Sequence, residues 1–403
     1  MSEQITWESY RDIAPPGTVD LGCRLAEQLR GKRLLHVNST RWGGGVAEML
    51  HRMVPLFQDL GLETRWDVIT GNPAFYQVTK SFHNALQGDP QEISRDMYDA
   101  YLKTNRQNGR KMDLDADLVV IHDPQPAPLI YKRRNKASAW LWRCHIDASR
   151  PQRKVWSFLK EHVAKYDGAI FSLPHFAQKL SIPQYLMYPS IDPLSDKNKD
   201  LPAEEISNIV RRFGIPDDKP MILQVSRFDR FKDPLGCIEA YRMVKKHNDC
   251  CLVLAGGGAA DDPEGAQVLA AVQDAAAQDP DIIILDLPPD SNIEINALQR
   301  AATVVLQKSL KEGFGLTVAE AMWKGKPVIG GFVGGITVQI VYGRTGFTVS
   351  CVEGCAYRIR YLLNNPDVAS RISESAREYT RRNFLVTRHI IDYLSLMAAV
   401  TTS

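Results

Sequence analysis

Two cations in the second half of the chain follow a short apolar segment. Arg227 and Lys232 come shortly after the run Met221–Val225, in the order Ser-Arg-Phe-Asp-Arg-Phe-Lys-Asp-Pro. Such a run predicts a buried parallel strand, and ligands of α/β sheets bind at the carboxyl ends of these strands. A pair of cations there could neutralise a departing diphosphate without a metal ion. Considered without its surroundings, the same pair is more typical of an exposed charged surface.

The segment richest in potential chemistry is a glycine-containing loop that leads into a predicted helix, Glu312-Gly-Phe-Gly-Leu-Thr-Val-Ala-Glu-Ala-Met. The backbone N–H groups of Leu316 and Thr317 would point at an anion bound to the helix N-terminus. Glu312 precedes the helix and Glu320 lies within it, so the two carboxylates can flank one extended ligand. Two alternatives stay open. Thr317 and Glu320 have the spacing of a capping box, and Glu312 could be an exposed loop acid.

Two runs of three glycines also follow predicted strands. Gly43–Gly45 precedes a helical pattern at 46–60, and Gly256–Gly258 follows the apolar run 252–255. Glycines at such places let backbone N–H groups come close to a phosphate. The first run matches neither the dinucleotide fingerprint nor a Walker loop. A plain tight turn is the alternative for the first run, and the second run is a weak signal when taken alone.

Two histidines occupy the predicted carboxyl ends of strands in the first half. His122 is followed by Asp-Pro, and His145 stands in Trp-Arg-Cys-His-Ile-Asp. A hydrogen-bonded structural histidine is the alternative for each, but two at one sheet edge favour a functional site. His36 lies in the middle of a predicted strand and is assigned to the core. The acids Asp113, Asp115 and Asp117 precede a strand, so they predict a solvated turn and no metal site.

Short apolar runs alternate with helical segments along the chain, which predicts parallel sheets covered on both faces. The pattern is interrupted by a polar, proline-bounded segment at 192–202, which predicts a linker. The simplest interpretation is two doubly wound α/β domains in tandem, at 1–195 and 205–383. The residues from 384 to 403 predict an amphipathic helix. Predicted strands lie at 32–38, 117–122, 137–143, 168–172, 221–225, 250–255, 282–285, 303–306 and 327–329.

Composition narrows the possible partners and location. The 403 residues carry a net charge of only +2, which argues against nucleic acid as the main partner. No apolar run approaches the ~20 residues that span a bilayer, and the N-terminal residues do not resemble a signal peptide. The 7 cysteines are scattered, which predicts free thiols in a reducing compartment. We therefore expect a cytoplasmic protein that binds no nucleic acid or membrane, with a homodimer as the commonest default.

The motifs of the second half occur in a recognisable order. They are Ser226-Arg-x4-Lys, Gly256-Gly-Gly, Glu312-Gly-Phe-Gly-Leu-x3-Glu-Ala and Gly334-Gly-x6-Tyr-Gly-Arg-Thr-Gly. This order resembles the family-four retaining glycosyltransferases. In the first half, Gly43-Gly-Gly-Val-Ala-Glu, His122-Asp-Pro-Gln-Pro and Trp142-Arg-Cys-His-Ile-Asp resemble the trehalose glycosyltransferring synthase branch of that family.

The resemblance implies the GT-B fold, with two facing Rossmann-like domains, the active site in the cleft between them, and a C-terminal helix that packs back on the first. It also implies that a nucleoside diphosphate glucose, such as UDP-glucose or ADP-glucose, donates glucose to free glucose. The products would be α,α-trehalose and the nucleoside diphosphate, with no further cofactor and no metal. One run, Gly335-Ile-Thr-Val-Gln339, departs from the family pattern and predicts a turn whose helix supports the site.

The resemblance also implies residue roles. Arg227 and Lys232 would hold the donor diphosphate and stabilise its departure, Glu312 would bind the hydroxyls of the donor glucose, and His145 would lie beside that sugar. Glu320 would bind the ribose hydroxyls. The other implied donor-binding residues are Gly44, Gly45, Gly256, Gly257, Leu287, Gly313, Phe314, Gly315, Leu316 and Thr317.

The resemblance also implies that His122 and Asp123 face the acceptor.

Three alternatives stay open for the activity. They are a trehalose phosphorylase, a related family-four enzyme with another acceptor, and a sugar-nucleotide sensor without turnover. Retention without an evident carboxylate nucleophile would mean front-face attack by the acceptor hydroxyl.

Overall fold

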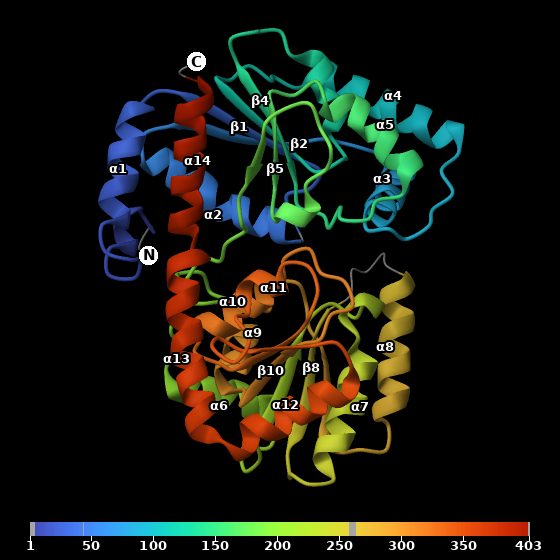
Figure 1. Cartoon of the computed structure of the whole chain (residues 1–403), viewed down its shortest axis with the longest axis vertical. Helices are drawn as coiled ribbons and strands as arrows, with labels where there is room; N and C mark the ends of the chain where they lie inside the picture. Colours follow the sequence, from blue (N-terminus) through green and yellow to red (C-terminus); the bar gives the residue numbers. More distant parts are fainter. Residues whose placement is uncertain (1–4, 43, 258–262, 402–403) are drawn as a thin grey trace. The chain divides into compact units, whose positions relative to one another are not determined.

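A computed structural model describes residues 5–42, 44–257 and 263–401. Gly43 and Gly258, which belong to the glycine runs above, lie outside the described residues. The chain divides into two compact units (Figure 1). Unit 1 contains Met1–Ser190 and Val386–Ser403, and unit 2 contains Ile191–Leu385. The C-terminal helix therefore belongs to the same unit as the N-terminal half of the chain.

Unit 1 is built on a parallel sheet of six strands in the order β2-β1-β3-β4-β5-β6. The strands are β1 Arg33–Asn38, β2 Glu63–Val68, β3 Leu118–His122, β4 Ala139–Cys144, β5 Gly168–Phe171 and β6 Gln184–Leu186. The central strands β3, β4 and β5 are buried along their whole length, as their continuous apolar runs require.

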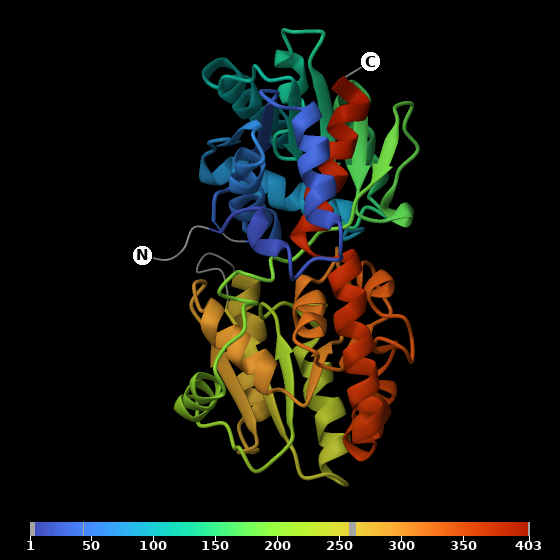
Figure 2. The ribbon, with the colours of Figure 1, turned by 90° about the vertical axis from the view of Figure 1, so that its left-hand side faces the viewer.

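The helices of unit 1 form two groups. Helices α1, α2 and α14 pack together, as do α3, α4 and α5. Figure 2 shows α14 beside α1 from a second direction. Their bounds are α1 Thr18–Gln28, α2 Gly45–Asp59, α3 Pro73–Leu86, α4 Arg95–Lys111, α5 Arg153–Val163 and α14 Val386–Thr401, with short 3₁₀ helices at Glu8–Tyr10, Ala127–Lys132 and Pro174–Phe176.

Unit 2 repeats the architecture with the strand order β12-β11-β10-β7-β8-β9, again all parallel. The strands are β7 Met221–Val225, β8 Cys251–Gly256, β9 Ile282–Asp286, β10 Val304–Gln307, β11 Val328–Gly331 and β12 Phe347–Val349. The helices are α6 Ala203–Arg212, η4 Arg230–Lys232, α7 Pro234–Lys245, α8 Pro263–Ala276, α9 Asn292–Ala301, α10 Leu316–Trp323, α11 Ile336–Gln339, α12 Val352–Asn364 and α13 Pro366–Asn383.

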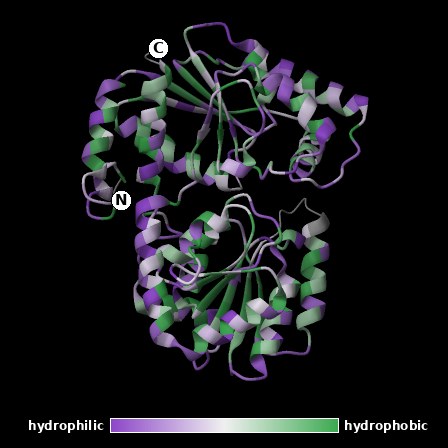
Figure 3. Cartoon of the chain, viewed as in Figure 1, coloured by the Kyte–Doolittle hydropathy of each residue, from purple (hydrophilic) through white to green (hydrophobic). Residues whose placement is uncertain are grey.

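The core of unit 2 lies on both faces of its sheet. Successive residues of β7 enter different clusters, Ile222 one and Leu223 the other, because neighbouring side chains of a strand point to opposite faces. In Figure 3 the hydrophobic colour follows the strands, and the hydrophilic colour lies along the outer helices. Within the described part of the chain, no helix combines the length and apolar character needed to cross a membrane.

Each strand order contains one switch point, where neighbouring strands lead to connections that diverge. In unit 1 it falls between β1 and β3, and in unit 2 between β7 and β10. Ligands of doubly wound sheets bind at the carboxyl ends of the strands at such points. The loops after β7 and β10 carry the cations and the glycine-rich segment predicted from the sequence.

The segment 192–202, which the sequence predicts as a linker, directly follows the boundary between the units and belongs to unit 2. This segment is pinned to α9 and α10 of unit 2. Asn296 Nδ2 donates to the carbonyl of Asp196 at 2.9 Å, and Lys324 Nζ donates to Asn198 Oδ1 at 2.7 Å. Asn198 is only 1% exposed. We call residues 192–202 the strap. Its many polar groups serve as donors and acceptors of buried hydrogen bonds to unit 2.

Candidate functional site

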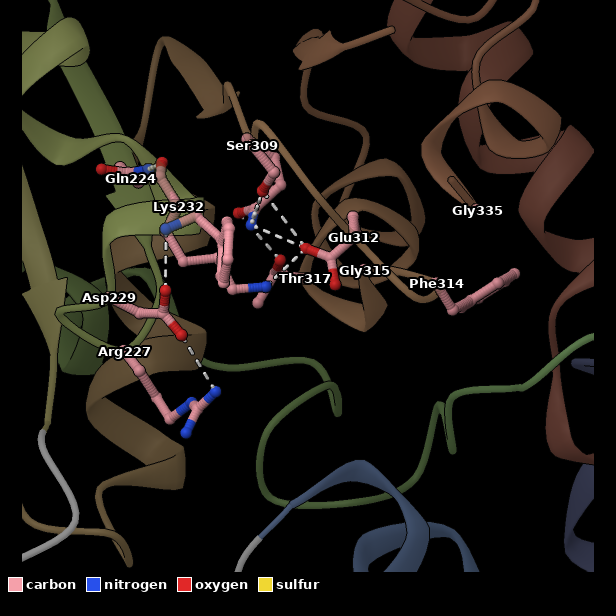
Figure 4. A network of polar contacts seen from close by, with 12 residues as sticks. Gln224, Arg227, Asp229, Lys232, Ser309, Glu312, Phe314, Gly315, Thr317 and Gly335 are labelled. Carbon is pink, nitrogen blue, oxygen red and sulfur yellow. Dashed lines mark hydrogen bonds and ion pairs between the residues drawn. The ribbon is translucent and has the colours of Figure 1, made fainter. Parts of the chain in front are cut away.

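The switch point of unit 2 brings together two loops that are far apart in the sequence. Lys232 ends the 3₁₀ helix η4 after β7, and Glu312 lies in the loop after β10. Their side chains form an ion pair, with Lys232 Nζ 2.6 Å from Glu312 Oε2 (Figure 4). Because β7 and β10 are hydrogen-bonded neighbours, their carboxyl ends deliver both residues to one edge of the sheet.

The Glu312 carboxylate sits in a set of polar contacts and is nearly buried. Its Oε2 also accepts from Ser309 Oγ at 3.2 Å and from Gln307 Nε2 at 3.3 Å. Gln307 in turn accepts from Thr317 Oγ1 at 3.0 Å. The alternative of an exposed loop acid is therefore wrong, since Glu312 is only 8% exposed. The carboxylate has one fixed direction relative to Lys232.

The turn that carries Lys232 is tied down independently of Glu312. Asp233 has a left-handed φ of +53°, which is strained for a residue other than glycine, and its side chain caps α7 at Gly236 N. It also forms an ion pair with Lys308, the first residue after β10. Gln224 Nε2 donates to the carbonyl of Lys232 at 2.7 Å. Lys232 is therefore presented by a rigid backbone.

Arg227 is held far more loosely. Its side chain is 62% exposed, and its Nη2 lies 3.3 Å from Asp229 Oδ2. Asp229 also caps the turn by accepting from Phe231 N at 2.7 Å. An exposed guanidinium beside Lys232 keeps most of its donors available to an anion.

The glycine-rich loop leads into the N-terminus of α10 as predicted. Gly315 is the N-cap with a left-handed φ of +83°, and no side chain caps the helix there. The alternative of a capping box is wrong, because the Thr317 hydroxyl bonds to Gln307 and Glu320 lies further along the helix. The helix N-terminus, with the amides of Leu316 and Thr317, is thus free of side-chain caps and favours an anion.

A second glycine pair makes this loop possible. A Cβ on Gly334 would lie 1.6 Å from the carbonyl oxygen of Glu312, and one on Gly335 would lie 2.4 Å from Phe314 Cα. The amide of Gly335 donates to the Gly313 carbonyl at 3.2 Å. The following short helix, α11, contributes Gln339, whose Nε2 donates to the Phe314 carbonyl at 2.6 Å. The run 335–339 therefore forms a turn and helix that support the loop, as predicted.

Gly256 and Gly257 allow close backbone packing at the end of β8. A Cβ on Gly256 would lie 1.7 Å from the Ser226 carbonyl oxygen, and one on Gly257 would lie 2.2 Å from the Leu287 carbonyl oxygen. Leu287 N donates to the Gly256 carbonyl at 2.7 Å. The structure thus brings these predicted residues together beside the segment that carries Arg227.

Glu320 is fully buried on α10. Its Oε2 accepts from Gln299 Nε2 at 3.3 Å, and its Oε1 lies 3.2 Å from Lys197 Nζ. Lys324 Nζ donates to Gln299 Oε1 at 2.7 Å. The side chain therefore lies in a polar network with Gln299 and Lys197.

In unit 1, the predicted residues His122, Asp123 and His145 lie at the carboxyl ends of β3 and β4. Asp123 follows β3 with a left-handed φ of +63°. Its Oδ1 accepts from His145 N at 2.7 Å, and its carbonyl accepts from Trp142 Nε1 at 2.9 Å. Burial raises the pKa of Asp123 to about 7, although the His145 amide and the charge of Arg143 lower it. A strained, fixed acid of this kind is typical of a functional site.

His122 and His145 belong to a chain of three histidine rings. His36 Nδ1 lies 3.0 Å from His122 Nε2, and His122 Nδ1 lies 2.9 Å from His145 Nε2. The assignment of His36 to the core alone was incomplete, since it begins this chain. Burial, together with the smaller effect of the charge of Arg143, lowers the pKa of His36 to about 3. Burial is also the main cause that lowers the pKa values of His122 and His145.

A small pocket with room for about one water molecule adjoins these rings. Arg143 reaches it from β4 and is fully buried, with its Nη2 donating to the Met187 carbonyl at 3.1 Å. The lining residues are Val46, Met49, Leu50, Met53, His122, Arg143, His145, His389 and Tyr393. All of them come from unit 1, including two from the C-terminal helix α14.

The glycine loop of unit 1 ends at the N-terminus of α2. Gly44 is its N-cap with a φ of +81° and no side-chain cap, and Gly45 begins the helix. A Cβ on Gly44 would meet nothing within 4 Å, so backbone conformation rather than packing requires glycine there.

Among residues 5–42, 44–257 and 263–401, no group of three or more potential ligands is placed to hold a metal ion. Asp113 and Asp115 instead pair with Arg65 and Arg33.

Several polar residues of these sites were missed by the sequence analysis. Gln224 and Gln307 stand in otherwise apolar strands, and Ser309 and Lys308 follow one of them. A lone polar residue in a buried strand near its carboxyl end was the available signal. His389 and Lys197 gave no comparable signal, because their sites depend on how α14 and the strap fold back.

The fold and the site define a glycosyltransferase of the GT-B class. Residues 36–178 match the family described as "Trehalose synthase, N-terminal domain", and residues 205–379 match "Glycosyl transferases group 1". A solved α,α-trehalose-phosphate synthase (UDP-forming) from Burkholderia xenovorans superposes with a TM-score of 0.74 at 13% identity, over 91% of this chain and 100% of that chain. A solved sucrose-phosphate synthase from Thermosynechococcus elongatus superposes with a TM-score of 0.71 at 16% identity, over 92% of this chain and 99% of that chain.

Closer relatives define the family. The trehalose synthase of Pyrococcus horikoshii is 46% identical over 97% of this chain and 95% of its own length. That of Rubrobacter xylanophilus is 42% identical over 93% of this chain and 92% of its own length. The chain belongs to the trehalose synthase family of glycosyltransferases, and its activity is thus of the trehalose-related hexosyltransferase type.

Proposed function

We propose that this protein is a retaining glucosyltransferase that joins the glucose of a nucleoside diphosphate glucose to free glucose. The products are α,α-trehalose and the nucleoside diphosphate. The substrates and product are its small-molecule partners, and the nucleotide sugar, UDP-glucose or ADP-glucose, is a co-substrate without a further cofactor or metal. The protein is proposed to act in the cytoplasm.

The observation that carries this proposal is the arrangement at the switch point of unit 2. Lys232 and Arg227 follow β7, and the uncapped N-terminus of α10 follows the loop that holds Glu312. A diphosphate needs cations and converging N–H donors, and both are supplied here. The contact with Glu312 uses one of the three donors of the Lys232 ammonium, which leaves others for phosphate oxygens.

The chemical step would follow from this charge distribution. As the bond between the glucosyl carbon and the phosphate oxygen lengthens, negative charge develops on the diphosphate. Arg227, Lys232 and the α10 amides would stabilise that charge in the transition state. The acceptor hydroxyl would attack from the face that the diphosphate leaves, and the phosphate oxygen would take its proton. Glu312 would bind hydroxyls of the donor glucose and fix its orientation.

Unit 1 would hold the acceptor. Asp123 and His145 are fixed to one another, and His122 orients His145 through a ring-to-ring hydrogen bond. Carboxylate and imidazole groups of this kind bind sugar hydroxyls as acceptors and donors. His145 would also lie beside the donor sugar.

A product assay tests the proposal. Purified protein is mixed with free glucose and with UDP-, ADP- or GDP-glucose in the presence of a chelator, and the products are followed by NMR. We expect a non-reducing disaccharide with both anomeric centres in the α configuration, and the best donor identifies the base. A reducing disaccharide, or an inverted anomeric centre, would contradict the proposed acceptor or stereochemistry.

A second candidate is phosphorolysis of trehalose, in which inorganic phosphate takes the place of the diphosphate. A trehalose phosphorylase from Pleurotus pulmonarius is 29% identical over 92% of this chain, which spans only 58% of that protein. The same cations would serve an inorganic phosphate. Release of glucose 1-phosphate from trehalose and phosphate, without any activity on nucleotide sugars, would favour this candidate.

A further inference from the structure

Lys197 lies against the carboxylate of Glu320, which the family resemblance implies as the partner of the ribose hydroxyls. Its Nζ is 3.2 Å from Glu320 Oε1, and the two side chains are 16% and 0% exposed. The lysine comes from the strap 192–202, which the sequence analysis interpreted as a linker. A partly buried cation beside this fully buried carboxylate requires an explanation, because removing a charged pair from water costs desolvation energy.

The strap is fixed on both sides of Lys197. Before it, Asn296 Nδ2 donates to the carbonyl of Asp196 at 2.9 Å. After it, Arg300 Nη2 donates to the Asn198 carbonyl at 3.0 Å, and Lys324 Nζ donates to the Asn198 side chain at 2.7 Å. The backbone at Lys197 is therefore anchored to α9 and α10, and the ammonium is held at the carboxylate by this anchoring.

The second oxygen of Glu320 is fixed as well. Gln299 Nε2 donates to Oε2 at 3.3 Å, and Gln299 Oε1 accepts from Lys324 Nζ at 2.7 Å. Lys197 and Gln299 thus approach different oxygens of one carboxylate. Together they leave the side chain one orientation.

The position of Glu320 on α10 suits a nucleoside attached to a diphosphate. It lies four residues after Leu316, which corresponds to about 6 Å along the helix. A diphosphate at the helix N-terminus would place the ribose that carries it one turn further along, at the level of this carboxylate. A carboxylate binds both hydroxyls of a ribose more tightly when its direction is fixed in advance.

We propose that Lys197 is a positioning residue for the nucleoside part of the donor. It orients the Glu320 carboxylate toward the 2′- and 3′-hydroxyls of the ribose and offsets the cost of its burial. This inference rests on the proposed function, in which a nucleoside diphosphate is bound. It predicts that Lys197 affects nucleotide affinity through the ribose hydroxyls alone and not through the phosphates.

The test compares UDP and ADP with their 2′,3′-dideoxy counterparts by isothermal calorimetry, using the full chain. K197M should weaken the binding of the better of UDP and ADP about 10-fold, the value of one hydrogen bond to a charged group, and change dideoxy binding less than about 2-fold. E320Q should show the same discrimination. K197R should restore most of the lost affinity, because it retains the cation.

K199M is the matched control, since Lys199 lies on the same strap but its ammonium pairs with exposed Asp196. It should leave the binding of both nucleotides unchanged. Equal losses for the ribose and dideoxy forms in K197M would show a merely structural role and overturn the inference alone. If E320Q shows no discrimination, the ribose role of Glu320 is wrong and the inference falls with it. If the wild-type chain binds none of UDP, ADP and GDP, the proposed function itself is contradicted.

Discussion

The ammonium of Lys232 and the carboxylate of Glu312 meet at 2.6 Å although 80 residues separate them in the chain. The crossover that makes β7 and β10 neighbours produces this contact. It has two consequences. The ion pair fixes the direction of a cation at the switch point, and it holds a nearly buried carboxylate beside the same place.

Replacing Lys232 with methionine should therefore affect both turnover and stability. We expect kcat to fall about 10²- to 10³-fold, because a preorganised charge is removed from the leaving group. We also expect a loss of about 1–3 kcal/mol in the free energy of unfolding, since Glu312 keeps its burial but loses its cation. Steady-state kinetics and urea unfolding measure the two effects.

The double variant K232M/E312Q separates these contributions. Removing the charge of Glu312 should recover part of the stability that K232M loses, because the buried carboxylate is no longer unpaired. Turnover should stay low. A K232M enzyme with kcat within a few-fold of the wild type would exclude a role for this cation in the chemical step.

Arg227 should behave differently, because its side chain is 62% exposed. We expect R227A to lower kcat about 10²- to 10³-fold with almost no change in the thermal midpoint. R230A is a useful comparison from the same turn, since the Arg230 guanidinium stacks over the Phe231 ring at 4.5 Å. Similar small losses in both variants would mean that the turn provides general positive charge and that Arg227 has no special role.

The sequence predicted the buried parts of the fold well and the edges poorly. The three strands that it missed, β2, β6 and β12, all lie at the edge of a sheet. Edge strands are partly exposed, and β2 alternates between exposed and buried residues at its start. Such strands lack the continuous apolar run that marks a strand covered on both faces.

For the site, the sequence predicted which loops matter but not the contacts within them. The glycine-rich segments and the cations follow strands, so their place at the sheet edge could be inferred. The hydrogen-bond partners of Glu312 could not be inferred from the sequence, because they depend on the order of strands in the sheet. The capping-box spacing at Thr317 was misleading for the same reason, since its hydroxyl finds Gln307 on a neighbouring strand.

Gly256 should tolerate no side chain. In G256A the new Cβ would lie 1.7 Å from the Ser226 carbonyl oxygen, so the backbone that leads to Arg227 must shift. We expect a loss of about 2–4 kcal/mol in stability together with a raised KM for the donor. G214A is the control, since Gly214 has a φ of +68° with nothing within 4 Å of an added Cβ. It should cost only about 1 kcal/mol, the strain of the left-handed conformation, and leave KM unchanged.

The comparison of G256A with G214A separates the cost of a steric clash from the cost of a left-handed backbone conformation. If G256A is no less stable than G214A, the close approach of β8 to the loop after β7 is not a constraint. If G256A is unstable but retains the wild-type KM, the loop position does not matter for donor binding.

The last prediction concerns pH and the buried groups of unit 1. The pKa of His36 is about 3, below its ordinary value, because burial disfavours the charged ring. The unfolded chain therefore binds a proton that the folded chain does not. The stability that this group contributes is present at neutral pH and is lost as the pH falls below about 6.5.

Asp123 acts in the opposite direction. Burial raises its pKa to about 7, so the folded chain holds a proton that the unfolded chain releases. Its contribution is present at acidic pH and is lost as the pH rises from about 4 to about 7. His122, His145 and His389 share the downward shift of the pKa of His36, so we expect the wild-type chain to be less stable at pH 5 than at pH 7.

Two substitutions should change the difference in the free energy of unfolding between pH 7 and pH 5, one decreasing it and the other increasing it. H36Q removes one group that resists protonation, so the loss of stability between pH 7 and pH 5 should shrink by about 2 kcal/mol. D123N removes the group that compensates, so the same loss should grow by about 2 kcal/mol. Urea unfolding of both variants and the wild type at the two pH values measures the effect as a difference, which cancels any uniform damage to the fold. If both variants keep the wild-type pH dependence, His36 and Asp123 titrate in the folded chain as they do in water, and the isolation of this corner of unit 1 from solvent is wrong.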